Sequence, residues 1–222
     1  WNYPCNDNAD SQVFPMDTYS NFYDMPAVWA QATLPSSLNN GLGVVSNPMQ
    51  QGEVSKTPLF SVANYAWNND GFDNMSSWEA SFKAVLPGNE REQAAYRFLA
   101  PYLRYNNLDD VISLVSSYKK TKDAAALIAR MEEIETQCNV LVSLKDSPVE
   151  GEALLYKDLS PWLLKLRAMA SVTRSLLNVA AAEGQDDSRW TSYLAELKHI
   201  NELSTAEEFK AYALEGMGSG IS

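Results

Sequence analysis

The residues best suited to chemistry are concentrated at the start of the chain. Residues 1–7 place aromatic rings, two amides and a carboxylate beside a proline. Sugar-binding sites use these groups, because aromatic rings cover the apolar faces of a sugar while Asn and Asp form directional hydrogen bonds with its hydroxyls. An Asn-rich turn has the same composition, so on chemistry alone this segment is a weak indication of sugar binding.

A second candidate segment lies at residues 43–49, which read GVVSNPM. Its short apolar run is typical of a strand, and Asn47-Pro48 follows that run as a binding loop follows a barrel strand. A strand that simply ends in a turn gives the same pattern. Both interpretations stay open on these residues alone.

The other reactive residue types have simpler structural explanations. His199 is the only histidine and no Cys stands at ligand spacing from it, so we expect no metal site and no cofactor. Cys138 falls on an apolar helical seam and is expected to be a small buried side chain, whereas Cys5 lacks a nearby base. The acidic pairs at 109–110 and 186–187 stand at the starts of expected helices, where the helix dipole favours carboxylates.

Charge and hydropathy exclude several classes of protein. The net charge is −11 and no stripe rich in Lys or Arg offsets it, so we expect no nucleic-acid partner. The sequence has no run of about 18 apolar residues, so we expect no membrane span. The chain starts at Trp1 without an initiator Met or a signal peptide, which indicates a piece of a longer protein.

The character of the sequence changes near Val54. Residues 1–53 contain no Lys or Arg and are rich in Asn, Pro, Ser, Gly and aromatic residues, which is typical of long loops with short strands. From Val54 onward, apolar residues recur every three or four positions, as they do in amphipathic helices. We therefore expect loops and short strands first and helices afterwards.

Three short helices are expected to come first. One spans residues 55–68, and a second opens with Ser76-Ser77 and Glu79 as its N-terminal cap and ends at Pro87-Gly88. Asn89 is expected to cap the third helix. The predicted apolar face of the first helix consists of Leu59, Ala63 and Ala66.

Longer helices are expected in the second half of the chain. One helix should run from Ser160 to Ala182, with Ser160 as its cap and Pro161 in its first turn. Two more are expected near residues 190–197 and 205–214, before a frayed tail at 216–222. The clearest apolar seam alternates steps of three and four, as in helices packed at shallow angles. This seam consists of Ala124, Leu127, Met131, Ile134, Cys138 and Leu141.

Taken together, these segments resemble glycoside hydrolase family 84. This family of β-N-acetylglucosaminidases includes bacterial so-called hyaluronidases and the enzymes that remove O-linked GlcNAc. The resemblance is carried by WNYP at 1–4, ND at 6–7, VSNPM at 45–49, SK at 55–56, LFSVANYAWN at 59–68 and SWE at 77–79. Beyond these segments the match is architectural, because the family's barrel is followed by a helical domain.

The resemblance implies a mechanism and a set of sugar contacts. The family's catalytic domain is a (β/α)8 barrel, and the 2-acetamido group of the substrate attacks the anomeric carbon with retention. One of two adjacent aspartates orients that group and the other is the general acid/base. Asn2, Asp7 and Asn47 match contacts to hydroxyl or acetamido groups of GlcNAc, and Trp1 matches a contact to the sugar face. The catalytic pair lies upstream in the family, so this chain should hold no catalytic residue.

One stretch departs from the family pattern. Residues 8–42 are longer than the usual connection and lack the basic, leucine-rich sequence usually found there. Their aromatic side chains either pack a long loop or line an altered aglycone site. These aromatic residues are Phe14, Tyr19, Phe22, Tyr23 and Trp29.

We therefore predict a mainly α chain in which an antiparallel helical bundle follows the loop-rich last strands and helix of a (β/α)8 barrel. Residues 1–70 would complete the barrel, residues 71–215 would form the bundle, and residues 216–222 would be a flexible tail.

The predicted function is that of the C-terminal part of a retaining β-N-acetylglucosaminidase, inactive by itself. Its expected partners are a GlcNAc-containing glycan and the rest of the barrel upstream. The bacterial members of the family imply a secreted, periplasmic or cell-surface location. Two other classes remain open, a helical interaction or scaffold module and a lectin-like remnant that binds GlcNAc without cutting it.

Overall fold

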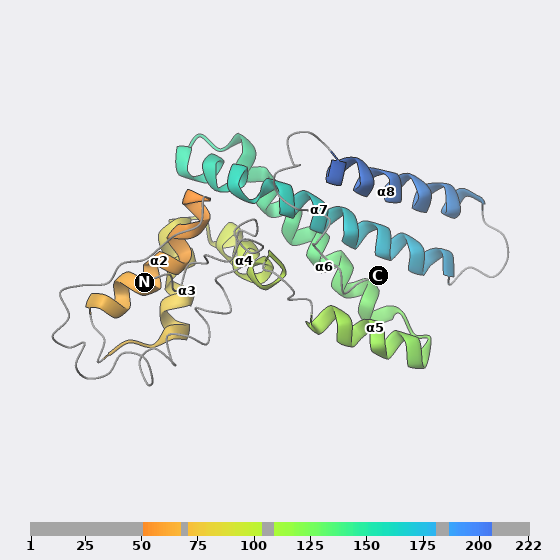
Figure 1. Cartoon of the computed structure of the whole chain (residues 1–222), viewed down its shortest axis with the longest axis horizontal. Helices are drawn as coiled ribbons and strands as arrows, with labels where there is room; N and C mark the ends of the chain where they lie inside the picture. Colours follow the sequence, from red (N-terminus) through yellow and green to blue (C-terminus); the bar gives the residue numbers. More distant parts are fainter. Residues whose placement is uncertain (1–50, 68–70, 104–108, 181–186, 206–222) are drawn as a thin grey trace. The chain divides into compact units, whose positions relative to one another are not determined.

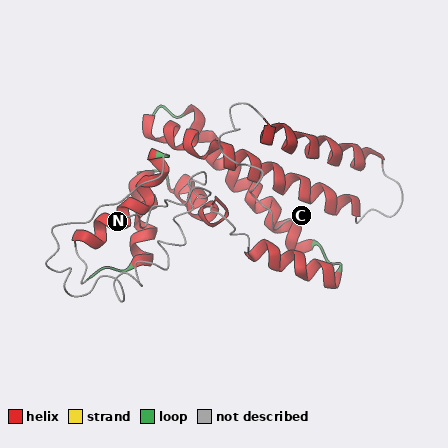
Figure 2. Ribbon diagram, in the orientation of Figure 1, coloured by secondary structure: helices red, strands yellow, loops and turns green. Residues whose placement is uncertain are grey.

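The computed structural model describes residues 51–67, 71–103, 109–180 and 187–205. Within these ranges the chain forms helices joined by short turns and contains no strand (Figures 1 and 2). The prediction of a mainly α chain is therefore confirmed over these residues. The predicted barrel strands lie before residue 51, outside the described residues, as do the helix expected at 206–214 and the tail.

Internal contacts divide the chain into two units. The first comprises residues 1–105 and 144–159, and the second comprises residues 106–143 and 160–222. Helix α7 (Glu150–Ala180) contributes to both units, since the division falls after Leu159. The predicted domain boundary at residue 70 stays a prediction.

In the first unit, α3 (Asn74–Val85) and α4 (Glu90–Leu99) enclose an aromatic core. Phe82 is 2% exposed and lies edge-on to two rings. Its centroid is 4.9 Å from that of Trp78 and 5.2 Å from that of Tyr96, at interplanar angles of 86° and 88°. Such edge-to-face pairs add about 0.5–1.5 kcal/mol each beyond the burial of area. The 3-10 turn η3 (Ala100–Leu103) continues this core with Tyr102.

The predicted cap of α3 is wrong by three residues. Asp73, not Ser76, is the N-cap, because Asp73 has an extended backbone and its carboxylate accepts the Ser76 N–H at 2.7 Å. This contact lowers the pKa of Asp73. The predicted end of the helix is confirmed, since the chain leaves α3 at Leu86 and Gly88 adopts a φ of 83°, which favours glycine.

Helix α4 begins after Asn89 as predicted, but the Asn89 side chain does not cap it. Its amide donates instead to the carboxylate of Glu152, which also accepts from the Ser147 hydroxyl. The side-chain amide of Gln93 donates to the Leu86 carbonyl at 2.7 Å and ties α4 to the end of α3.

Helix α2 (Gly52–Trp67) confirms the first predicted helix but buries a different face. Ala63 and Ala66 are exposed, and Trp67 is 92% exposed. The buried side approaches its neighbours through small polar groups, with the Thr57 hydroxyl 3.4 Å from the Tyr96 hydroxyl. Hydropathy ranks Ala and Leu above Ser and Thr, so the sequence pattern selected the wrong face. The buried residues are Val54, Ser55, Thr57, Pro58 and Ser61.

The predicted start of the long helix is also wrong. Helix α7 begins at Glu150 rather than Ser160 and continues through Pro161. A proline inside a helix removes one backbone hydrogen bond and crowds the preceding turn. The helix continues here because fully buried side chains anchor it on both sides of the proline. These are Leu155 and Leu159 before it and Trp162 and Leu163 after it.

The second unit is an antiparallel helical bundle, as predicted. It contains α5 (Asp109–Thr121), α6 (Ala125–Val142), the second part of α7 and α8 (Asp187–Thr205). Arg167 of α7 contacts Asn139 of α6 at 3.1 Å, and Arg174 contacts Glu135 at 2.9 Å, so residue numbers rise along one helix as they fall along the other. Ser175 likewise bonds to Glu196 of α8 at 2.8 Å.

The predicted seam on α6 is confirmed. Five of its members are buried, and Ala124 is partly exposed at the N-cap. The predicted helix near 190–197 is confirmed as α8, although it presents apolar side chains to solvent. Trp190 is 47% exposed, Leu194 57% and Leu197 37%. Among the helices described, none is long and apolar enough to cross a membrane.

Candidate functional site

The predicted sugar contacts lie before the described part of the chain. Trp1, Asn2, Asp7 and Asn47 are all outside the described residues, so their roles stay predictions. The described structure begins at Gln51, four positions after Asn47, and enters α2 at once. The start of α2 is therefore the described element nearest in sequence to a predicted sugar contact.

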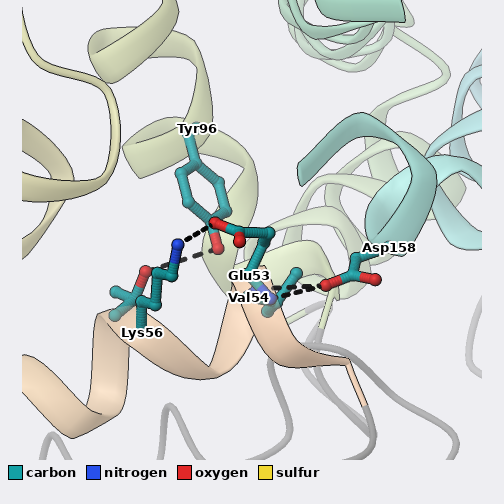
Figure 3. Close-up of polar contacts among 6 residues, drawn as sticks. Glu53, Val54, Lys56, Tyr96 and Asp158 are labelled. Atoms are coloured by element: carbon teal, nitrogen blue, oxygen red, sulfur yellow. Dashed lines mark hydrogen bonds and ion pairs between the residues drawn. The ribbon is translucent and has the colours of Figure 1, made fainter. Parts of the chain in front are cut away.

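The N-terminus of α2 is capped by a residue distant in sequence. The carboxylate of Asp158, on α7, accepts the backbone N–H of Glu53 at 2.7 Å and that of Val54 at 3.4 Å (Figure 3). The first four N–H groups of a helix have no partner within it, and a carboxylate satisfies them and favours the positive end of the helix dipole. Asp158 thus joins α7 to the first turn of α2.

Charged and polar neighbours surround this contact. Burial raises the pKa of Asp158, the two backbone N–H groups oppose that rise, and the Glu53 carboxylate adds to it. Lys56 forms an ion pair with Glu53 (Figure 3). Tyr96 is fully buried beside Thr57, and its burial raises the pKa of the phenol.

Gln51 is the residue immediately before α2. Its side chain is 4% exposed, and its carbonyl accepts the Ser55 N–H at 3.0 Å, as the carbonyl of an N-cap residue does. Neither polar atom of its side-chain amide has a hydrogen-bond partner. The buried Gln51 side chain therefore holds its place by packing, and it does not cap the helix.

Two of the remaining candidates, His199 and Asp110, lie on described helices. His199 is exposed on α8, as expected for a surface residue. The Asp110 carboxylate lies 3.3 Å from Arg130 of α6, which fits the structural interpretation of that acid. Asp186 and Cys5 lie outside the described residues. Within the described ranges, no group of three or more His, Cys, Asp or Glu side chains is placed to hold a metal ion.

Cys138 is a buried free thiol, as predicted. Burial raises its pKa from the ordinary value of 9.0 to about 12, with Arg167 lowering it and Glu135 raising it. Above pH 9 the unfolded thiol loses its proton while the native thiol keeps it, so the native state binds more protons and stability falls as pH rises. The buried phenol of Tyr96 acts in the same direction.

We therefore expect the free energy of unfolding to decrease between about pH 9 and 11, by at most about 1.4 kcal/mol per pH unit for each such group. Urea unfolding followed by tryptophan fluorescence at several pH values measures this slope. Cys138→Ala should flatten the slope, whereas Ser143→Ala, on the same segment, should leave it unchanged. Equal slopes for the wild type and Cys138→Ala would contradict the prediction.

Comparison with known proteins relates this chain to the glycoside hydrolases. Residues 1–100 match the family model NAGidase, described as beta-N-acetylglucosaminidase. The fold matches a solved structure of a protein called CpGH84D with a TM-score of 0.64 and 23% identity over 92% of this chain. At that identity the structural match shows the fold, and the chain spans 34% of the length of that protein.

These two findings confirm the predicted resemblance to the C-terminal part of a family 84 β-N-acetylglucosaminidase. The family match covers the four predicted sugar contacts and extends through α2 and α3 to η3. The structural match extends over the helices that follow.

The sequence analysis did not identify Asp158 as the residue that caps the start of α2. A signal was present, because Asp158 shares a helix face with Leu155, Leu159 and Trp162, which are all fully buried. An acid within an apolar stripe needs partners that satisfy its charge. The identity of those partners, two backbone N–H groups more than 100 positions away, required the tertiary structure.

Proposed function

We propose that this chain is the C-terminal part of a retaining, substrate-assisted β-N-acetylglucosaminidase. The observation that carries the proposal is the match of residues 1–100 to the β-N-acetylglucosaminidase family model, in the segment with the WNYP, ND and VSNPM motifs. Residues 1–70 complete a (β/α)8 barrel whose remaining strands lie upstream, and the helices after them buttress that barrel. The substrate is a glycan that ends in GlcNAc, outside the cytoplasm.

The proposed roles follow from the chemistry of the side chains. Asn2 and Asn47 offer both amide donors and a carbonyl acceptor to sugar hydroxyl or acetamido groups, and the Asp7 carboxylate accepts from hydroxyls. Trp1 covers an apolar face of the ring. The 2-acetamido oxygen attacks the anomeric carbon as the leaving group takes a proton from an upstream acid, and water then opens the cyclic intermediate. These residues bind and orient the sugar, and none of them is the acid or the nucleophile.

Hydrolysis of an aryl β-N-acetylglucosaminide tests the proposal directly. We expect no turnover by the 222-residue chain. We expect turnover by the same chain extended upstream through about 300 residues, the approximate size of a barrel. Activity of the 222-residue chain would mean that acids within it are catalytic. Inactivity of both the short and the extended protein would contradict the proposed function.

The exposed apolar side chains of α8 favour a second candidate function, a helical interaction module. Trp190 and Leu194 are about half exposed, as are side chains that contact another protein. Under this alternative, removal of residues 1–50 should leave the free energy of unfolding of the helices nearly unchanged, and both proteins should lack hydrolase activity. Turnover of the aryl glycoside by the extended protein would exclude the interaction module as the main function.

A further inference from the structure

The turn that joins α5 to α6 carries the densest group of positive charges in the sequence. Three of the 17 Lys and Arg residues stand within positions 119–122, although the chain has 28 acidic residues and a net charge of −11. Lys119 and Lys120 lie in the last turn of α5, and Lys122 follows the helix (Figure 1). All three residues are exposed, and we call them the lysine turn.

The lysine turn makes no ion pair with the residues that the structure describes. Elsewhere in the same unit, Arg130, Arg174 and Lys198 each pair with a carboxylate. The acid that follows the lysine turn, Asp123, accepts the Ala125 N–H at 2.9 Å at the start of α6. The positive charge of the lysine turn is therefore available to an external anion.

The backbone at Lys122 gives a second, independent indication. Lys122 has a φ of 62°, and within the described residues no other non-glycine residue has a positive φ. Helices often end in this left-handed conformation, usually at Gly or Asn, because other side chains are strained there. A cation also favours the C-terminus of a helix, but Lys119 and Lys120 already supply that charge to α5. A contact with an external anion accounts for the lysine at this position.

The surroundings of the lysine turn are polar. Ser116, Ser117 and Thr121 are exposed beside it, and the nearest exposed large hydrophobic side chain of α5 is Ile112, two turns before Lys119. Stable binding to an anionic membrane takes about four to eight cationic residues or apolar side chains that insert into the lipid. The lysine turn offers neither, which disfavours a membrane as its partner.

The acidity of the whole chain selects among polar anionic polymers. A polymer as densely charged as duplex nucleic acid would be repelled by a protein of net charge −11. A polysaccharide whose sugars carry single carboxylates has a lower charge density, so this repulsion is weaker. Its hydroxyl groups also match the serine and threonine hydroxyls beside the lysines.

We propose that the lysine turn is a docking surface for a carboxylated polysaccharide. The choice of a polysaccharide rests on the proposed function, in which the protein acts on a glycan. Exposed ion pairs are individually weak, so the three lysines together should strengthen binding by about threefold to a hundredfold. Contacts of this strength retain the protein on an extended polymer and still allow it to move along the chain.

Affinity electrophoresis of the 222-residue chain tests the docking surface, with carboxymethyl dextran in the gel and unmodified dextran as the neutral reference. We expect only carboxymethyl dextran to retard the wild type. Joint replacement of Lys119, Lys120 and Lys122 by glutamine should weaken the affinity by about tenfold. Retardation should also decrease as the salt concentration rises from about 50 to 200 mM, because salt screens exposed charges.

The matched control replaces Lys83, Lys145 and Lys198 by glutamine. These lysines are also exposed but lie far apart in the sequence, so the net charge changes equally without loss of the cluster. We expect the control variant to stay within about twofold of the wild type. Equal loss of affinity in the two triple variants would overturn the lysine turn as the docking surface.

Lys122→Gly separates docking from stabilisation of the turn. Glycine adopts the left-handed conformation without strain, so Tm should stay the same or rise. The affinity for carboxymethyl dextran should nevertheless fall by about twofold to fivefold, and Lys122→Arg should retain it. A lower Tm with unchanged affinity would mean that Lys122 only stabilises the turn, and would overturn its docking role.

The remaining outcomes separate the partner from the proposed function. No retardation of the wild type would overturn the docking surface, and tighter lysine-dependent binding to dextran sulfate or to anionic phospholipid vesicles would overturn a carboxylated polysaccharide as its partner. Hydrolysis by the barrel-extended protein, which is this chain with the upstream barrel residues restored, is measured separately. An inactive extended protein would contradict the proposed function, whereas lysine-dependent retardation would still support the docking surface.

Discussion

Replacement of Phe82 by alanine should lower the free energy of unfolding by about 3–5 kcal/mol, the typical cost of removing a buried phenylalanine ring. The cost is expected at the high end because Phe82 is 2% exposed and is held edge-on between Trp78 and Tyr96. Loss of the ring removes apolar burial and both aromatic contacts, and it leaves a cavity between α3 and α4.

Urea unfolding followed by tryptophan fluorescence measures this cost, and Phe98→Ala is the matched control. Phe98 lies on α4 in the same unit but is only partly buried, with its ring 5.6 Å from Tyr102 at 43°. We expect Phe98→Ala to cost about half as much or less, since it removes less buried surface. Equal costs for the two variants would mean that the aromatic core is not centred on Phe82.

The second large effect is expected at Asp7. In the barrel-extended protein, Asp7→Ala should lower kcat/KM by about a hundredfold to a thousandfold, the loss typical of a group that contacts the reacting substrate. A carboxylate that accepts from sugar hydroxyls forms charge-assisted bonds, and its removal leaves those hydroxyls without a partner. Asp7→Asn should recover part of the loss because an amide oxygen still accepts.

Steady-state hydrolysis of an aryl β-N-acetylglucosaminide provides the measurement for Asp7. Asp10→Ala is the control, since Asp10 is an acid three positions along the chain and outside the ND motif. We expect Asp10→Ala to stay within about threefold of the wild type, because it removes no contact to the sugar. Similar losses for the two variants would indicate a general effect of acidic residues in this segment, and Asp7 would no longer be a sugar contact.

The presence of helices could be predicted from the sequence, because the spacing of apolar residues along a helix is a local pattern. The steps of three and four from Leu127 to Leu141 placed the seam of α6 on one face, and the structure buries that face. The end of α3 was also predicted from local sequence, since Pro87-Gly88 disfavours continuation of a helix and Gly88 adopts a positive φ.

The errors at α7 and α2 arose where a tertiary contact outweighed a local preference, whereas the error at the cap of α3 was local, between Asp73 and Ser76. Pro161 is typical of a first helical turn, yet α7 already exists there because buried leucines hold the preceding turns. The face of α2 was predicted from Leu59 and Ala63, whereas close approach to its neighbours requires small hydroxyl side chains such as Thr57.

The mainly helical fold, the buried seam of α6 and the resemblance to family 84 could be predicted without coordinates, because they depend on periodicity and on motifs along the chain. The buried face of α2 and the residue that caps this helix became evident from the three-dimensional packing alone. Asp158 and the N–H of Glu53 are separated by 105 positions, and they meet because α7 and α2 pack together, which no local pattern encodes.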